Sequence, residues 1–529
     1  MNLMKKVTKS VFSALLFLIL ITKSIYSQIN QIDVKEYRFT IRVSDANDSI
    51  SIQETIEFLW LDKTKTPCLN LTSLKKNGKG MRIKEIEKGG KKIEFIHKMD
   101  TIYLTGLTYS EELFELEINY SGVPADGLVI GNNKYGNRTF FGDNWPTRAQ
   151  NWMACNDHLS DKAKVYFSVT VPSHYEVIAN GIHQSTITLS EKEKSWNYYS
   201  DIELPTKVMV IGIADFSVKW NDKHYVSSWV YPENEKGGFY DFDLAPGILD
   251  FFNDYIAPYP FSTLANVQST TRFGGMENAG CIFYDENAIN GTRSSEALIA
   301  HEIAHQWFGN SATESDWPHL WLSEGFATYL TLIYQEKVKG IELFKQELEQ
   351  DRKQIIAFSK SYPNPVIDST QKNLMKLLNA NSYQKGSWLL HMLRKKVGDK
   401  TFQTILQTYY STYKFSNASS TDFERVTEEI SGLELTSFFN QWLRKPGIPK
   451  LSVRLSIKKK NIAGSINQMQ NDGVYEFPLQ LKVNFNDGSS TIETIAISER
   501  STKINKSYSK KISSFALDPN VELLFEESK

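Results

Sequence analysis

The sequence has few cysteines, no excess charge of either sign and no apolar run long enough to cross a membrane. Its 529 residues include three Cys, and an odd number leaves at least one thiol unpaired. Lys and Arg total 60 against 61 Asp and Glu, which gives a formal net charge of −1. This balance gives no reason to expect nucleic acid as a partner. A chain of this length buries a core large enough to fold without disulfides.

The first 27 residues have the pattern of a secretory signal peptide. Three Lys precede the apolar stretch VFSALLFLILI at residues 11–21, and the small Ser27 comes just before Gln28. Eleven apolar residues are too few for a membrane span, which needs about 20. We therefore expect residues 1–27 to be cleaved, with no stable membrane span left in the mature chain. The mature chain is expected to be exported to the bacterial periplasm or the extracellular space.

Hydrophobic periodicity divides the mature chain into three regions, at residues 28–216, 217–449 and 450–529. The first alternates apolar and polar residues, as at Tyr37, Phe39 and Ile41, and predicts an antiparallel β domain, sandwich-like or saddle-shaped. The second changes to the helical period, and the third returns to alternation, which predicts a small C-terminal β-sandwich. The expected fold is therefore multidomain α+β.

The middle region contains several expected helices. The helix that contains residues 301–305 should begin near Ser294 or Ser295, which are good N-cap residues, and end at Gly309–Asn310. Another should contain Glu324 and run to about residue 340. Further helices are expected at residues 342–360, 383–397, 399–413, 421–431 and 435–444.

The strongest chemical pattern consists of His301, Glu302, His305 and Glu324. It reads His-Glu-Ile-Ala-His and, after eighteen residues, a Glu within Trp-Leu-Ser-Glu-Gly-Phe-Ala. Residues four apart on a helix share a face, so the two His can bind one metal ion. Two imidazoles and a carboxylate are a typical ligand set for catalytic Zn²⁺, which keeps a further position for water. We predict one Zn²⁺ per chain. The alternative, a helix with two ordinary surface or core histidines, leaves the downstream Glu unexplained.

Glu302 lies between the two histidines and is the predicted general base. Zn²⁺ lowers the pKa of water that binds it to about 7, so water becomes a nucleophile at neutral pH. In this motif the Glu faces the metal cavity without binding the metal, which suits it to carry the proton of water to a leaving amine. The motif predicts a metalloprotease or a related hydrolase.

Two further segments extend the pattern to a family resemblance. Gly274-Gly275-Met276-Glu277-Asn278 ends 23 residues before His301, and Asn381-Ser382-Tyr383-Gln384-Lys385-Gly386-Ser387 follows Glu324. Together with the metal motif they resemble the gluzincin family of aminopeptidase N and leukotriene A-four hydrolase. Residues 145–162 and 439–449 resemble the family more diffusely. The resemblance covers nearly the whole mature chain and implies a thermolysin-like zinc catalytic domain between two β domains.

The resemblance also implies roles for individual residues. Tyr383 would stabilise the oxyanion formed when a peptide carbonyl is attacked. Glu277 would bind the free α-ammonium of the substrate, which sets the distance from the N-terminus to the metal and makes the enzyme an exopeptidase. The rest of that segment would contact the substrate, chiefly through backbone atoms: Gly274, Gly275, Met276 and Asn278.

One departure from the family concerns the amine site. The family usually places a Gln of the N-terminal domain there, and the corresponding residue here is Asp143, or Asn144 if the alignment shifts by one position. A carboxylate binds an ammonium well, so we expect Asp143 to contribute to substrate binding.

These patterns predict an exported zinc aminopeptidase that acts on peptides with a free N-terminus. Two other hypotheses stay open: a zinc endopeptidase or epoxide hydrolase of the same clan, and a catalytically inactive member that serves as a binding or scaffold module. The intact metal motif, Glu302 and Tyr383 favour an enzyme, and Glu277 favours an aminopeptidase. The sequence predicts neither the side-chain preference nor the oligomeric state.

Overall fold

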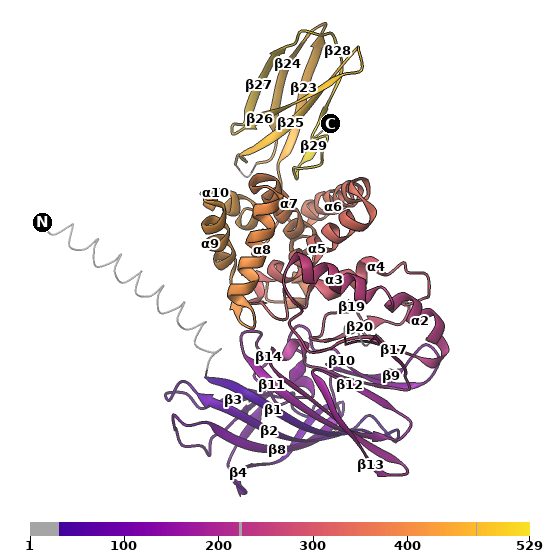
Figure 1. Ribbon diagram of the computed structural model, residues 1–529. Helices are drawn as coiled ribbons and strands as arrows, with labels where there is room; N and C mark the ends of the chain where they lie inside the picture. The colour runs from indigo at the N-terminus through magenta and orange to yellow at the C-terminus, as the bar shows by residue number, and fades with distance from the viewer. Residues whose placement is uncertain (1–30, 222–224, 472, 529) are drawn as a thin grey trace, which may run out of the picture. The chain divides into compact units, whose positions relative to one another are not determined.

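The computed structural model describes residues 31–221, 225–471 and 473–528, and these form two compact units (Figure 1). Unit 1 contains the chain up to Tyr240 together with Phe261–Thr292. Unit 2 contains Asp241–Pro260 and the chain from Arg293 onward. The predicted signal peptide lies outside the described residues. The domain boundaries expected at 216/217 and 449/450 stay predictions.

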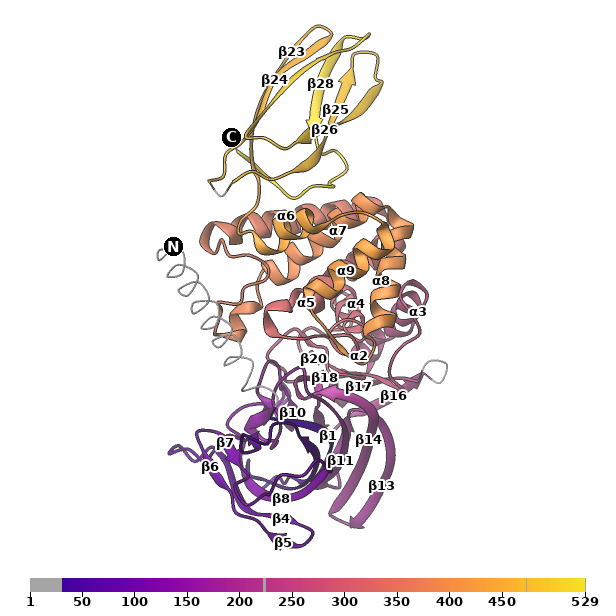
Figure 2. The ribbon, with the colours of Figure 1, turned by 90° about the vertical axis from the view of Figure 1, so that its left-hand side faces the viewer.

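Unit 1 is built on an eight-stranded sheet with strand order β13-β14-β11-β1-β2-β8-β4-β5. Burial alternates along its central strands as the period-two pattern predicts, for example in β2, where every second residue is buried, whereas the edge strand β13 is exposed throughout. Figure 2 shows this sheet to be strongly curved. Its strands are β1 (Ile32–Arg42), β2 (Ile50–Trp60), β4 (Gly80–Lys88), β5 (Lys91–Lys92), β8 (Phe114–Val123), β11 (Lys162–Pro172), β13 (Ile182–Ser190) and β14 (Glu193–Pro205).

Three smaller sheets complete unit 1. A three-stranded sheet contains β3 (Cys68–Asn70), β7 (Thr101–Tyr103) and β6 (Ile96–Lys98), and a four-stranded sheet contains β12 (Glu176–Ala179), β15 (Ile211–Ala214), β10 (Arg138–Gly142) and β9 (Leu128–Asn132). The third has five strands: β16 (Ser217–Asn221), β17 (Val226–Val230), β18 (Leu264–Ser269), β20 (Cys281–Asp285) and β19 (Gly275–Met276). In it β17, β18 and β20 are parallel, and β19 pairs antiparallel with β20.

Unit 2 begins with a helical region around α5 (Trp321–Lys339). This helix is buried over most of its length, because α4, α6 and α7 all pack against it. The other helices are α3 (Ala245–Tyr255), α4 (Glu296–Ala304), α6 (Ile341–Ser361), α7 (Gly386–Val397), α8 (Asp399–Tyr413), α9 (Ser420–Ser431) and α10 (Thr436–Phe439), with π-helical turns η6 (Asn381–Lys385) and η7 (Asn440–Arg444). Apart from the end of α4, the expected helices are thus confirmed within a few residues. Helix α2 (Glu235–Phe242) was not predicted.

The expected end of the helix that begins after Ser295 was wrong. Helix α4 ends at Ala304, five residues before Gly309. The backbone N–H groups of Gln306 and Trp307 bond three residues back instead of four, at 3.1 and 3.2 Å, so the helix tightens into a turn. The Trp307 indole donates to the Ala257 carbonyl at 2.9 Å, which holds this turn against the end of α3.

The C-terminal part of unit 2 consists of two small sheets, which Figure 1 shows as neighbouring layers. One has the order β27-β24-β23-β29 and the other β26-β25-β28. Their strands are β23 (Lys450–Lys458), β24 (Asn461–Gln468), β25 (Phe477–Phe485), β26 (Ser490–Ile497), β27 (Ser501–Ser507), β28 (Ile512–Leu517) and β29 (Glu526–Ser528). The multidomain α+β fold expected from the sequence is confirmed.

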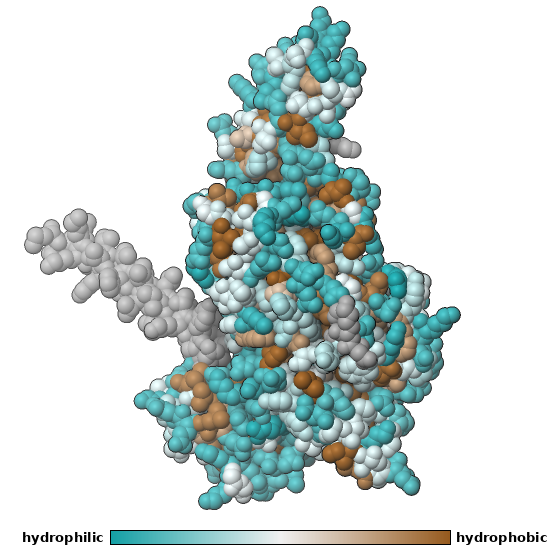
Figure 3. Space-filling model, in the orientation of Figure 1, coloured by the Kyte–Doolittle hydropathy of each residue, from teal (hydrophilic) through white to brown (hydrophobic). Residues whose placement is uncertain are grey.

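The surface carries hydrophobic side chains in scattered positions. On the face drawn in Figure 3 hydrophilic residues predominate and hydrophobic residues form small separate groups. In the described part of the chain, no helix has the length and hydrophobicity needed to span a membrane.

Candidate active site

Helix α4 and the turn that follows it bring His301 and His305 together. His305 is the C-cap residue and keeps right-handed helical dihedrals, with φ −58° and ψ −22°. The two residues therefore remain one helical turn apart although the helix ends between them. Their Nε2 atoms lie 3.0 Å from each other, and the planes of the two rings are inclined by 84°.

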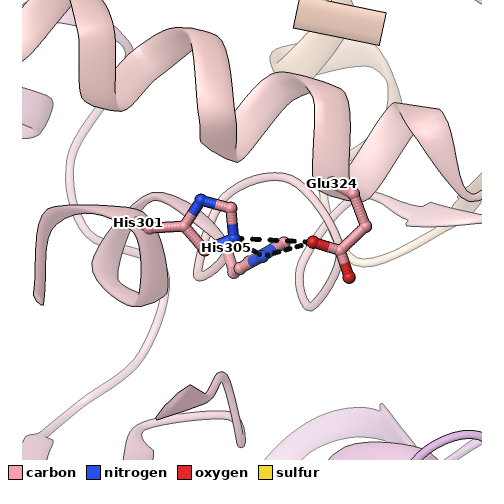
Figure 4. A group of neighbouring side chains, drawn as sticks. All are labelled: His301, His305 and Glu324. Carbon is pink, nitrogen blue, oxygen red and sulfur yellow. Dashed lines mark hydrogen bonds and ion pairs between the residues drawn. The ribbon is translucent and has the colours of Figure 1, made fainter. Parts of the chain in front are cut away.

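Glu324, near the start of α5, completes a three-ligand group with the two histidines (Figure 4). Its Oε2 lies 3.5 Å from Nε2 of His301 and 3.2 Å from Nε2 of His305. Ligand atoms about 2.0–2.2 Å from a tetrahedral Zn²⁺ stand about 3.3–3.5 Å from one another. The three measured separations, 3.0, 3.2 and 3.5 Å, are close to that spacing. The donor set therefore fits one tetrahedral ion and leaves a fourth position.

The His305 ring is held in one orientation by contacts on its other nitrogen. Nδ1 lies 3.2 Å from the Phe308 carbonyl and 3.1 Å from Oγ of Ser323. An Nδ1–H donated to that carbonyl leaves the lone pair on Nε2, the atom that faces Glu324. Gly309, at φ +121°, permits this packing, because a Cβ there would stand 2.3 Å from Oγ of Ser323.

The electrostatics of the group favour metal ligation. Burial lowers the pKa of His301, although Glu324 opposes the shift, so the imidazole stays neutral and its lone pair is available. Burial alone would raise the pKa of Glu324, but charges and hydrogen bonds from His305 and His301 outweigh it and lower that pKa. A divalent cation needs neutral imidazole and ionised carboxylate ligands, and the directions of the His301 and Glu324 pKa shifts favour these forms.

Glu302 follows His301 on α4, and only 4% of it is exposed. Its backbone carbonyl accepts from the Gln306 side chain at 3.2 Å. A buried carboxylate next to a metal ligand suits the predicted base, and the role itself stays a prediction.

Tyr383 lies beside the metal group. Its ring stacks near the His301 ring, with centroids 6.0 Å apart and planes inclined by 12°. Tyr383 sits in the π-helical turn η6, which contacts α5 at a pair of glycines. A Cβ on Gly325 would stand 2.9 Å from Cα of Gly386, so both positions must be glycine for these two backbones to approach so closely.

The Gly274–Asn278 segment belongs to unit 1 and forms the edge of the five-stranded sheet. Gly275 pairs with Tyr284, and Met276 pairs with Phe283. Glu277 is 5% exposed and Asn278 is fully buried.

Asp143 and Asn144 are both fully buried in unit 1. The Asn144 amide donates to the carbonyls of Thr206 and Met209 and accepts from the Trp152 indole at 2.8 Å. Its hydrogen-bonding groups are therefore used within unit 1. The Asp143 carboxylate faces two guanidinium groups, those of Arg148 and Arg272, and the Arg272 Nε lies 3.2 Å away. A substrate ammonium at Asp143 would have to compete with these two cations.

Several residues that shape the site were missed by the sequence reasoning. Gly325 and Gly386 set the approach of η6, and Ser323 orients His305. A glycine inside a helical pattern is a signal of close approach, so the two glycines could have been singled out. Arg272 carried no signal, because its partners are more than 120 residues away in the sequence.

Comparison with known proteins finds a family model that matches the region of the site. Residues 240–442 match the model of the peptidase family M1 domain. These residues, which make up less than half of the chain, are similar to a peptidase family M1 domain. The resemblance inferred from the motifs is thus confirmed. The predicted metal ligands, Glu302, Tyr383 and the Gly274–Asn278 segment lie within the M1 domain, and Asp143 lies outside it.

Similar proteins are aminopeptidases by name. Probable aminopeptidase 1 of Sulfurisphaera tokodaii is 26% identical over 456 residues, which cover 80% of this chain and 56% of that protein. Human glutamyl aminopeptidase is 26% identical, with 77% of this chain and 45% of that protein covered. The alanine/arginine aminopeptidase of Saccharomyces cerevisiae is 27% identical, with coverages of 73% and 48%. The chain spans about half the length of these relatives.

Proposed function

We propose that this protein is a zinc-dependent aminopeptidase that removes residues from peptides with a free N-terminus. The observation that carries the proposal is the convergence of His301, His305 and Glu324 at tetrahedral spacing inside an M1 domain. The names of the similar proteins support the activity.

The chain's own residues would divide the reaction among them. When bound, one Zn²⁺ would lower the pKa of water and polarise the scissile carbonyl. Glu302 takes the proton from the attacking water and passes it to the leaving amine. The Tyr383 hydroxyl donates to the carbonyl oxygen as negative charge develops there. Glu277 pairs with the α-ammonium, and the backbone of Gly274, Gly275, Met276 and Asn278 aligns the peptide.

Export is a second part of the proposal and has its own test. It rests on the signal-peptide pattern of residues 1–27. N-terminal sequencing of the protein from its native host should begin near Gln28. A mature protein that retains Met1 would exclude cleavage at this position.

Two substitutions test the mechanism. Aminoacyl fluorogenic substrates with a free amine, and the same substrates after N-acetylation, should be assayed together with the metal content. Glu302→Gln should reduce kcat by about 10²- to 10⁴-fold and retain one zinc per chain. Glu277→Ala should impair the free-amine substrates most. Glu349→Gln, an exposed change on α6, is the matched control.

The outcomes separate the alternatives. Full activity of Glu302→Gln would exclude the proposed base. Equal cleavage of blocked and free substrates by the wild type would indicate an endopeptidase, and turnover of an epoxide alone would indicate an epoxide hydrolase. A chain without stoichiometric zinc and without chelator-sensitive turnover would be the inactive binding or scaffold member.

A further inference from the structure

Four charged side chains of unit 1 form a compact, electrically neutral cluster. The Arg272 guanidinium contacts Oδ1 of Asp126 at 2.5 Å and Oδ2 of Asp143 at 3.2 Å. Arg148 contacts the other oxygen of Asp143, and its Nη1 lies 3.3 Å from Oδ1 of Asp126. Two carboxylates thus neutralise two guanidinium groups. Asp143 is fully buried and Arg148 is 9% exposed, so the contact between them is weakly screened by solvent, whereas the side chains of Arg272 and Asp126 are partly exposed.

The cluster joins two parts of unit 1 that are distant in the sequence. Asp143 directly follows β10, whereas Arg272 lies two residues before Gly274. The neighbour of Arg272, Phe273, packs edge to face on Trp145, with centroids 6.4 Å apart. Arg272 and Phe273 therefore attach the start of the Gly274–Asn278 segment to the residues that follow β10.

The other end of that segment is attached by an amide. Asn180, fully buried, donates from Nδ2 to the carbonyls of Ala279 and Val208, both at 2.8 Å. Between the two attachments, Gly275 and Met276 of β19 pair with β20, and the carbonyls of Gly274 and Asn278 accept from the backbone N–H groups of Asp285 and Cys281, both at 3.0 Å. The Arg272 cluster at one end and Asn180 at the other thus add side-chain attachments to the backbone bonds that hold the segment carrying Glu277.

We propose that Asp126 and Asp143 are positioning residues that hold Arg272, and through it the Gly274–Asn278 segment, in the arrangement that presents Glu277 to the substrate ammonium. The inference rests on the proposed function, and it assigns Asp143 a role through Arg272 in place of direct contact with substrate. Both carboxylate oxygens of Asp143 already face guanidinium groups, which supports the indirect role.

A double-mutant cycle distinguishes the two roles of Asp143. Asp143→Asn, Arg272→Gln and the double variant should be compared on a free-amine substrate. If the pair acts as one clamp, each single change raises KM for the free amine by about tenfold, and the double change raises it no further. The kcat for the free-amine substrate should change by less than about threefold, whereas general damage to the fold would lower kcat as well as raise KM. Arg272→Lys should recover part of the loss.

Other outcomes overturn the inference. If Asp143 binds the ammonium directly, Asp143→Asn raises KM strongly, Arg272→Gln lowers it or leaves it unchanged, and the two effects add. If Asp143→Asn fails to fold, Asp126→Asn takes its place in the cycle, because Asp126 is partly exposed. Arg42→Gln breaks an exposed ion pair with Glu193 elsewhere in unit 1 and is the control.

A measurement without substrate keeps the inference separate from the proposed function. Hydrogen–deuterium exchange of a peptide covering residues 273–280 should be faster in Arg272→Gln than in the wild type and in Arg42→Gln. Unchanged exchange would exclude the clamp even if the enzyme proves to be an aminopeptidase. Faster exchange in a chain that cleaves no free-amine substrate would support the clamp and reject the proposed function.

Discussion

At the residue scale, some polar side chains occupy buried positions that the local sequence pattern predicts to be apolar. Glu54 is an example, since it occupies a buried position of β2 that the alternation reserves for apolar residues. Its Oε2 accepts a hydrogen bond from the Tyr120 hydroxyl at 2.7 Å. Burial nevertheless raises the pKa of Glu54 from 4.5 to about 8, and the Tyr120 bond opposes this only in part.

Glu54 should make the stability of the N-terminal β region depend on pH. Its folded pKa lies above its unfolded pKa, so folding favours the protonated form. That contribution is complete below pH 4.5 and is lost as the pH rises through about 8. Glu54→Gln should therefore melt of the order of 5 °C above the wild type at pH 9 and close to it at pH 4. Calorimetry checks this, with the exposed Glu115→Gln as control. The prediction would be contradicted if the melting temperature of Glu54→Gln differed from that of the wild type by the same amount at pH 4 and at pH 9.

At the element scale, the site depends on how closely α5 approaches the turn η6. The π-helical turn places Tyr383 next to His301, and the contact of Gly325 with Gly386 allows it. A helix was expected from residue 383, but its first turn has π geometry, which is common at functional sites.

Adding one methyl group at this contact should displace Tyr383. Gly325→Ala would place a Cβ 2.9 Å from Cα of Gly386 and 3.1 Å from the Ser382 carbonyl, so η6 must move. A shift of about 1 Å should lower kcat by about 10²-fold, while zinc binding persists. Gly247→Ala on α3 meets no atom within 4 Å and is the control. Steady-state kinetics and metal analysis provide the measurement; an unchanged kcat would mean that the approach of η6 to α5 does not set the proposed role of Tyr383.

At the scale of the whole molecule, the C-terminal strands are joined to the helical region by buried polar contacts within unit 2. Arg352 on α6 donates to Asp518 at 2.5 Å and to the Leu523 carbonyl at 2.8 Å. The guanidinium lies over the rings of Trp388 and Phe525, 5.0 and 5.1 Å from their centroids. We infer that the C-terminal strands and the helices unfold together.

Removing one partner of this pair should destabilise unit 2 as a whole. Asp518→Asn leaves the Arg352 guanidinium buried without its counter-charge, at a cost of about 3–5 kcal/mol. Lys360→Gln, which breaks an ion pair with Glu526 that is exposed on the lysine side, should change stability by less than about 1 kcal/mol. Thermal unfolding followed by calorimetry should show a lower transition for Asp518→Asn alone. Independent melting of the C-terminal strands in the wild type would refute the joint unfolding.

Local information accounts for what could be predicted. Periodicity predicted the β, helical and β regions, because burial of one face repeats every second residue in a strand and about every 3.6 residues in a helix. Spacing predicted the pair His301 and His305 even though α4 ends at Ala304, because a capping residue with helical dihedrals preserves the turn. The length of α4 was not predictable from local pattern. The turn that ends it is held by the hydrogen bond from the Trp307 indole to the carbonyl of Ala257, which lies fifty residues earlier in the sequence.

The sequence by itself determined the order of the elements, the metal-ligand set and the family resemblance, all of which depend on residues close together or on short motifs. Only the tertiary structure decided which distant residues meet outside this motif: Gly325 with Gly386, and Arg272 with Asp126 and Asp143. Such meetings depend on packing between elements and on pairing of buried charges, and neither has a period or a spacing that can be read along the chain.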